Sequence, residues 1–180
     1  SRNPNDRGVL VTQTLDKGLR KGVNLTLEAK SQPLGPDEVA SDGYQEGANL
    51  TVGHAALIDV GAGGSITLRS GRNLVVDGTL RAHGGTISLG ILGARGSDSE
   101  PANASSSQDT RGYLADQMLR LGSHAHLDAS GWAKVYTDAA GRQTGEILGG
   151  GTVNLNYDLS VPVRGKLLAE VGSQIDVSGA

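Results

Sequence analysis

A double glycine that leads into a short alternating segment recurs along this chain and limits the folds that the chain can adopt. It occurs at Gly63-Gly64-Ser65-Ile66-Thr67-Leu68, at Gly84-Gly85-Thr86-Ile87-Ser88-Leu89 and at Gly150-Gly151-Thr152-Val153-Asn154-Leu155, and the first two copies are 21 residues apart. Each copy alternates apolar and polar residues, which is the period of a β-strand with one buried face. Such recurrence is typical of proteins in which similar layers are stacked.

A second motif consists of Asn-Leu followed by an alternating pair. It begins at Asn24, Asn49 and Asn73, and a looser copy begins at Asn154. The spacings of the first three copies are 25 and 24 residues. We interpret these copies as equivalent strands in successive layers.

A third motif places an aspartate directly after an aliphatic residue and shortly before a glycine. It occurs around Asp59, Asp128 and Asp176. We expect each carboxylate to accept backbone N–H hydrogen bonds in the turn that follows it. A carboxylate ladder for catalysis or calcium binding is the alternative interpretation.

The interval between Ile66 and Ile87 predicts three short strands separated by glycines. The strands are centred on Ile66–Leu68, Leu74–Val76 and Leu80–Ala82. About 21 residues would then form one three-strand coil, with strands of successive coils ~4.8 Å apart and paired in parallel. The predicted fold is an all-β parallel β-helix, a solenoid in which Ile66 stacks on Ile87. A hairpin-built sandwich is the alternative, but it does not require the same motif at the same phase of each period.

Three segments interrupt the periodicity and predict loop or hairpin excursions. They lie near residues 31–46, 93–118 and 132–146. At the end of the second, the segment 111–121 is compatible with one or two helical turns or with an irregular strand that returns the chain to the coil. The remaining residues suffice for five or six coils. We therefore interpret residues 1–180 as a single β-helix segment of a larger protein.

The composition fits a narrow, repetitive core and excludes several classes of function. The chain has 28 Gly, one Trp, no Phe and no Cys, with a net charge of −3. Without cysteine there are no disulfides and no thiolate metal sites. No basic stripe favours nucleic acid as a partner. No segment approaches the ~20 apolar residues of a membrane-spanning helix, so we expect a protein that does not span the membrane.

The motifs together resemble the filamentous haemagglutinin family, the large exoproteins of two-partner secretion systems. The resemblance rests on Gly-Gly-Ser-Ile-Thr-Leu at 63–68, Asn-Leu-Val-Val-Asp-Gly-Thr-Leu at 73–80, Leu-Asp-Ala-Ser-Gly at 127–131 and Ile-Asp-Val-Ser-Gly-Ala at 175–180. It covers about two-thirds of the chain, outside the excursions. It implies a right-handed β-helical shaft, export with an outer-membrane transporter as partner, and a role in adhesion or contact-dependent competition. The location implied is secreted or extracellular, on the bacterial cell surface.

The residues suggest few sites for chemistry. His124 and His126, with Asp128 next on the same strand face, suggest a metal pair, but solvent-facing polar positions beside buried Ala125 and Leu127 explain them as well. Arg69, Arg72, Asp77 and Arg81 fall within one coil, and salt-paired surface positions account for them equally. We therefore predict no catalytic residue, no cofactor and no metal site.

Trp132 and Tyr136 are the residues for which we expect partner contacts, because they lie in the third excursion. Packing of these aromatic residues against the shaft is an equal alternative. The predicted function is a structural shaft segment of a surface-exposed bacterial adhesin or contact-dependent effector, with a cell-surface receptor or glycan as partner. The alternatives are a carbohydrate-active β-helix enzyme, a polysaccharide lyase or hydrolase, and a self-associating scaffold.

Overall fold

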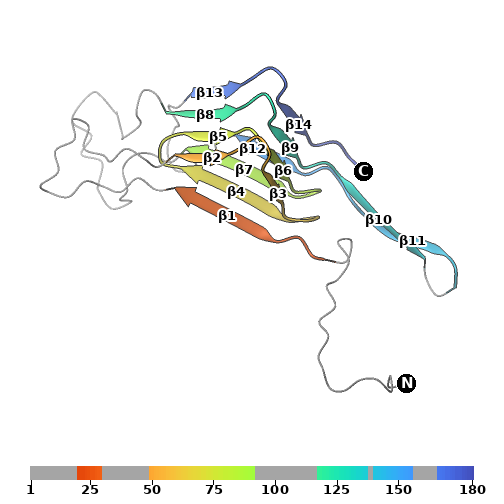
Figure 1. The fold of residues 1–180 in the computed structure, drawn as a ribbon. Coiled ribbons are helices and arrows are strands. Elements are labelled where there is room, and N and C mark those ends of the chain that lie inside the picture. The colour runs from red at the N-terminus through yellow and green to blue at the C-terminus, as the bar shows by residue number, and fades with distance from the viewer. Residues whose placement is uncertain (1–19, 30–48, 92–116, 138–139, 156–165) are drawn as a thin grey trace, which may run out of the picture.

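The computed structural model describes residues 20–29, 49–91, 117–137, 140–155 and 166–180 (Figure 1). The predicted excursions at 31–46 and at most of 93–118 lie outside these residues. The described residues form strands and turns, with no helix among them. Nor is there, in this part of the chain, a helix long and apolar enough to cross a membrane.

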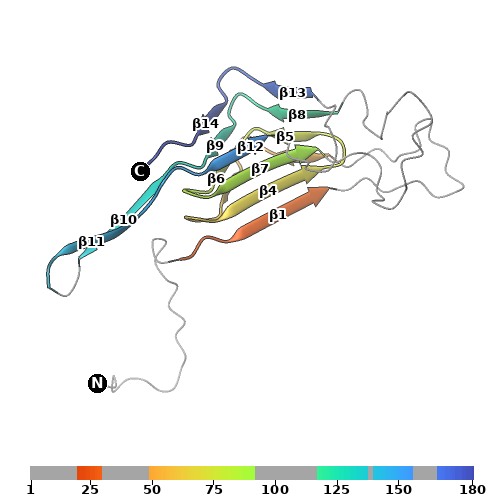
Figure 2. The ribbon, with the colours of Figure 1, turned by 180° about the vertical axis from the view of Figure 1, so that it is seen from behind.

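Twelve strands form three parallel sheets of four strands each (Figures 1 and 2). The first sheet contains β1 (Asn24–Ala29), β4 (Ser65–Ser70), β7 (Thr86–Ile91) and β12 (Thr152–Leu155). The second sheet contains β2 (Leu50–Val52), β5 (Leu74–Val76), β8 (Met118–Leu121) and β13 (Lys166–Ala169). The third sheet contains β3 (Leu57–Asp59), β6 (Thr79–Arg81), β9 (His126–Asp128) and β14 (Gln174–Asp176).

Each sheet takes one strand from each of four successive stretches of chain, which we call levels one to four. Level one is β1-β2-β3, level two β4-β5-β6, level three β7-β8-β9 and level four β12-β13-β14. This parallel arrangement is compatible with a β-helix or another solenoid. The described residues identify no closed solenoid, because the links between the first and second sheets at levels one, three and four lie outside them.

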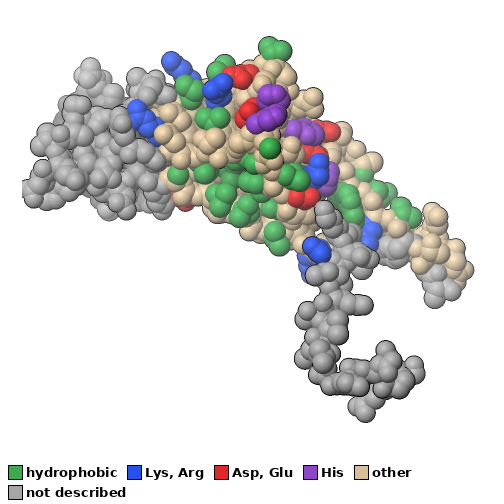
Figure 3. All heavy atoms as spheres, in the orientation of Figure 1, with side chains coloured by type: hydrophobic (Ala, Val, Ile, Leu, Met, Phe, Trp, Pro, Cys, Tyr) green, Lys and Arg blue, Asp and Glu red, His purple; other side chains and the backbone are tan. Residues whose placement is uncertain are grey.

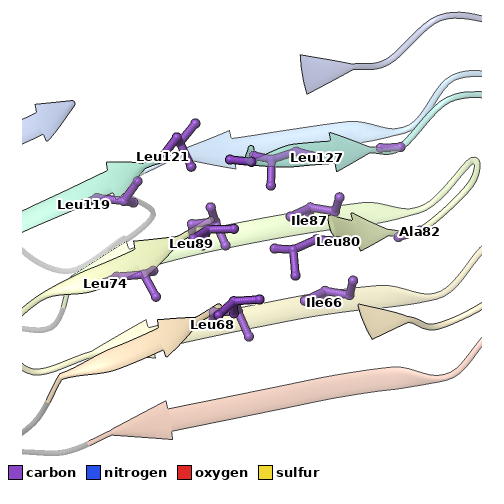
Figure 4. Packing of buried hydrophobic residues seen from close by; sticks show 14 of the residues in the cluster. Ile66, Leu68, Leu74, Leu80, Ala82, Ile87, Leu89, Leu119, Leu121 and Leu127 are labelled. Atoms are coloured by element: carbon purple, nitrogen blue, oxygen red, sulfur yellow. The ribbon is translucent and has the colours of Figure 1, made fainter. Parts of the chain in front are cut away.

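The strands predicted between Ile66 and Ile87 are confirmed as β4, β5 and β6, and so is the stacking of like residues. Ile66 lies beside Ile87, and Leu68 beside Leu89. The same register holds in the other sheets, where Leu74 lies beside Leu119 and Leu80 beside Leu127. All eight side chains are fully buried between the three sheets (Figure 4). The core is therefore a set of aliphatic columns that run across the levels.

One detail of the sequence interpretation is wrong. Asn24 was grouped with Asn49 and Asn73, but it pairs with Ser65 in the first sheet, whereas Leu50 pairs with Leu74 in the second. An alternating Asn-Leu segment fits either sheet. The alternation of apolar and polar residues determines which face of the strand is buried, but it does not determine which strand lies beside it. The described strands form four levels. The expected number of five or six coils stays a prediction, because it includes residues outside the described ranges.

The end of the range predicted for the second excursion lies at the start of strand β8. Met118 begins strand β8, so the chain is already in the second sheet at a position that the expected range 93–118 included. Of the two alternatives for the end of that segment, the structure has the strand, because Leu119 and Leu121 are fully buried on one face.

The double glycines are explained by the close approach of successive levels. A Cβ added to Gly85 would lie 2.0 Å from the carbonyl oxygen of Gly64, and one added to Gly151 would lie 2.1 Å from that of Gly85. The preceding residues Gly63 and Gly84 have φ angles of 72° and 60°, which L side chains rarely adopt. In the first two pairs the first glycine thus turns the corner, and in all three pairs the second glycine admits the neighbouring backbone.

The third predicted excursion is an antiparallel hairpin of β10 (Trp132–Thr137) and β11 (Gln143–Leu148). It leaves the stack between levels three and four and projects away from the sheets (Figures 1 and 2). The hairpin spans the segment near 132–146 for which an excursion was predicted.

Candidate functional site

The corner between the second and third sheets brings together two imidazoles and a carboxylate. His54 belongs to level one, Asp77 to level two and His124 to level three. One ligand atom from each side chain lies within 4.8 Å of the other two. The ring centroids of His54 and His124 are 3.9 Å apart at an interplanar angle of 64°. Figure 3 shows histidine and acidic side chains side by side on this face.

The lengths of the corners explain why residues from alternate levels meet. Level two turns with the two residues Asp77 and Gly78, whereas level one uses Gly53–Ala56 and level three uses Gly122–Ala125. The longer corners extend beyond the shorter one, so their imidazoles lie over Asp77. Gly122 allows this approach, because a Cβ there would lie 2.2 Å from Asp77 Oδ1.

Asp77 is anchored within this cluster. Its Oδ1 accepts a hydrogen bond of 3.1 Å from the backbone N–H of His124 and lies 3.4 Å from His124 Nδ1. The backbone bond from His124 is the main reason why the pKa of Asp77 is lowered, and the charges of His124 and His54 act in the same direction against a smaller effect of burial. The carboxylate is thus ionised and aimed at the two histidines.

A second polar cluster runs across the outer face of the third sheet. Arg81 lies between Asp59 and Asp128, with nitrogen–oxygen distances of 3.9 Å and 3.2 Å. His83 Nδ1 lies 3.4 Å from Asp128 and 3.1 Å from the hydroxyl of Ser130. The surface pairing expected for Arg81 is therefore confirmed.

The motif aspartates cap the turns that follow them, as the sequence predicts. Asp59 accepts from the N–H of Gly61 at 3.0 Å, Asp128 from that of Ser130 at 3.2 Å, and Asp176 from that of Ser178 at 2.9 Å. These Asp-to-Gly corners lie at the same place in the third sheet at levels one, three and four, where level two has Arg81 instead. The capping therefore gives the turns after β3, β9 and β14 a shared geometry.

Asp128 is the most constrained of these carboxylates. It also accepts a 2.6 Å bond from the Ser130 hydroxyl, and its side chain is almost fully buried. Burial opposes ionisation, but the hydrogen bonds from Ser130, the charge of His83 and the bond from Arg81 outweigh it and lower the pKa of Asp128. An anion held in this way stabilises the folded state above its pKa.

Replacing Asp128 by asparagine is expected to destabilise the protein by about 1–3 kcal/mol at neutral pH, because Arg81 and His83 lose the buried charge that they face. Because the pKa of Asp128 is lower in the folded protein than its ordinary value of 3.8, its carboxylate stabilises the folded state at pH values above 3.8. This contribution to the free energy of unfolding is lost as the pH falls through the pKa of the folded state. The free energies of unfolding of wild type and Asp128→Asn, measured in urea, should therefore differ at about pH 7 and become similar at about pH 2. Asp176→Asn, at an exposed turn, is the matched control, and equal effects of the two variants would contradict this account.

The hairpin carries the residues for which partner contacts were predicted. Trp132 is half-buried at its base and pairs with Leu148. Tyr136 pairs with Thr144 through the backbone, and its side chain lies outside the described residues. The exposed apolar side chains are instead Val135 and Ile147, which are 64% and 72% exposed. The sequence does not mark Val135 and Ile147 as exposed, because exposure of an aliphatic residue leaves no local signal.

The charged residues that fall within one coil of the sequence lie on different parts of the structure. Arg69 lies in the first sheet, Asp77 at the corner and Arg81 in the third sheet, so these residues do not share a face. Likewise, His124 and His126 do not form a pair with Asp128. His126 lies on β9, while the ring of His124 packs against His54.

Comparisons with known proteins returned no relative. No family model matches the chain, no curated protein is similar to it, and no solved structure matches the fold.

Proposed function

We propose that this chain is a right-handed parallel β-helix that serves as a shaft segment of a secreted, surface-exposed bacterial adhesin or contact-dependent effector. The observation that supports the proposal best is the stack of four levels in the described residues, with the hairpin of β10 and β11 projecting from it. A stack of similar backbone layers forms an elongated rod, and a segment that leaves such a rod is placed to meet a partner.

The exposed core positions of level four support a place within a longer shaft. Leu167 and Ile175 belong to the aliphatic columns of the core, beside Leu119 and Leu127, yet they are 51% and 47% exposed at level four. Exposed strand edges with apolar side chains attract further strands. We infer that another level or a capping segment covers them. Pairing of two chains end to end would cover them as well.

Export and location are proposed from the family resemblance. A chain without cysteine crosses membranes without the obstacle of premature disulfides. An outer-membrane transporter would be its partner during export, and a receptor or glycan on a host or neighbouring cell would be its partner afterwards.

The hairpin is the surface that we propose for this second partner. Ala133, Val135 and Ile147 share one face of the ribbon, because Ala133 pairs with Ile147 and Val135 lies two residues further along. All three are exposed. An apolar face on a projecting ribbon offers contact area with little backbone reorganisation on binding.

The double variant Val135→Ser/Ile147→Ser tests this surface. We expect binding of the purified chain to target cells, measured by flow cytometry, to fall at least about tenfold, because central apolar contacts dominate most interfaces. The melting temperature should stay within about 2 °C of wild type, since both side chains are already exposed in the free protein.

Val171→Ser is the matched control, because Val171 is 97% exposed at a corner outside the hairpin. Binding that is unchanged in the double variant, or that falls equally in the control, would refute the hairpin as the binding surface. Absence of any binding to bacterial and animal cells or to a glycan array would refute the adhesive role.

A carbohydrate-active enzyme is the second candidate, and one observation favours it. Asp59, Arg81 and Asp128 come from three successive levels and place two carboxylates around a cation. A general acid needs a raised pKa, however, and the pKa of Asp128 is lowered. Cleavage of a polysaccharide by wild type but not by Arg81→Ala would establish the enzyme, and no cleavage by wild type would exclude it.

A further inference from the structure

We propose that His54, Asp77 and His124 form a binding site for a divalent transition metal ion, and that Zn²⁺ is the ion it accepts. The three ligands come from three levels, and their ligand atoms all lie within 4.8 Å of one another. The inference does not depend on the proposed function, because it rests on the corner of the stack and not on the hairpin.

The chemistry of the ligands favours zinc over the common hard cations. Neutral imidazole nitrogens and a carboxylate oxygen are standard zinc ligands, whereas Ca²⁺ and Mg²⁺ prefer oxygen alone. Three protein ligands leave a fourth tetrahedral position for water or for a group from a partner. Copper and nickel ions bind such sites too, with Cu²⁺ the tightest of the series.

The geometry requires only small side-chain movements. In a tetrahedral zinc site, ligand atoms ~2.1 Å from the metal lie about 3.4 Å from one another. The side chain of His124 is 57% exposed and His54 lies in an exposed turn, so both imidazoles can rotate to close the difference. The contacts described above for Asp77 involve Oδ1, so Oδ2 can serve as the metal ligand.

Level four supplies a second layer of support. The hydroxyl of Ser123 lies 3.2 Å from His124 Nδ1, and the N–H of Ser123 donates to Glu170 Oε2 at 3.1 Å. Arg120 in turn holds Glu170 in an ion pair. Polar partners of this kind orient ligating histidines. All four levels thus contribute to the position of the cluster.

A turn cap alone does not explain the arrangement. Capping requires only the Asp77 carboxylate and the N–H of His124. It assigns no role to the imidazole of His54, whose ring lies against His124 with centroids 3.9 Å apart. A shared cation accounts for both rings and for the carboxylate between them.

Isothermal titration calorimetry with ZnCl₂ tests the site, using residues 1–180 without a histidine tag and stripped of metal with a chelator. We expect one Zn²⁺ per chain. His54→Ala and His124→Ala should each weaken binding at least about tenfold, the lower bound for the loss of an orienting partner. The melting temperature of wild type should rise with added Zn²⁺, because only the folded chain assembles the site.

His83→Ala and His126→Ala are the matched controls, because they remove the chain's two other histidines, which lie outside the cluster. They should bind Zn²⁺ as wild type does. Equal affinity of His54→Ala and wild type would overturn the site, as would an equal loss in His126→Ala, which indicates adventitious surface binding. Circular dichroism confirms that each variant is folded, and His54→Gln replaces His54→Ala if it is not.

Discussion

Replacing Leu80 by aspartate is expected to abolish cooperative folding of this protein. Leu80 is fully buried in the third sheet, between Ile58 and Leu127 of the neighbouring levels. Loss of a buried leucine costs about 2–5 kcal/mol, and an unpaired buried carboxylate costs several more. The sum is comparable with the whole stability of a domain, about 5–15 kcal/mol. Thermal melts followed by circular dichroism should show no cooperative transition.

Thr79→Asp is the matched control, because Thr79 is the preceding residue on the same strand and faces outward. The same charge there should change the stability by about 0.5 kcal/mol or less. A cooperative melt of Leu80→Asp near the wild-type temperature would mean that the aliphatic columns are not the core.

Replacing Gly85 by alanine is expected to destabilise the protein by about 3 kcal/mol, at the upper end of the usual cost of overpacking. The added Cβ would meet the carbonyl oxygen of Gly64 at 2.0 Å, and that oxygen also accepts the N–H of Thr86. The atoms that the Cβ would meet belong to the backbone and cannot rotate away as a side chain could. The clash is therefore relieved only by separating levels two and three. Urea unfolding followed by the fluorescence of the single tryptophan, Trp132, measures the loss.

Gly149→Ala serves as the control for this substitution, because no atom lies within 4 Å of a Cβ built there. It should leave the stability within about 0.5 kcal/mol of wild type. If Gly85→Ala is equally neutral, the close stacking of the glycine corners is not as the structure has it.

Local patterns were enough to predict most of one level and its stacking. The alternation around Ile66 and Leu74, with glycines between, specified three strands and the face that each one buries. The aspartate before each glycine specified the turn cap, because a short carboxylate reaches the N–H groups two residues ahead. These features depend on neighbours close in sequence, which is why the sequence displays them.

The candidate metal site was beyond such reasoning. His54 and His124 are 70 residues apart, and they meet because a corner of two residues lies between two corners of four. The sequence suggested His126 and Asp128 as neighbours of His124 instead, since those residues are close along the chain. A comparison of the corner lengths between successive levels is the sequence signal that could have placed His54 near His124.

By itself, the sequence determined that the chain forms short parallel strands with aliphatic columns and glycine corners, because strand period and turn chemistry are local. Only the tertiary structure decided that Asn24 belongs with Ser65, that the described strands make four levels, and that three corners share one cluster. The physical reason is that alternation sets which face of a strand is buried, whereas the choice of neighbouring strand depends on backbone contacts between distant segments.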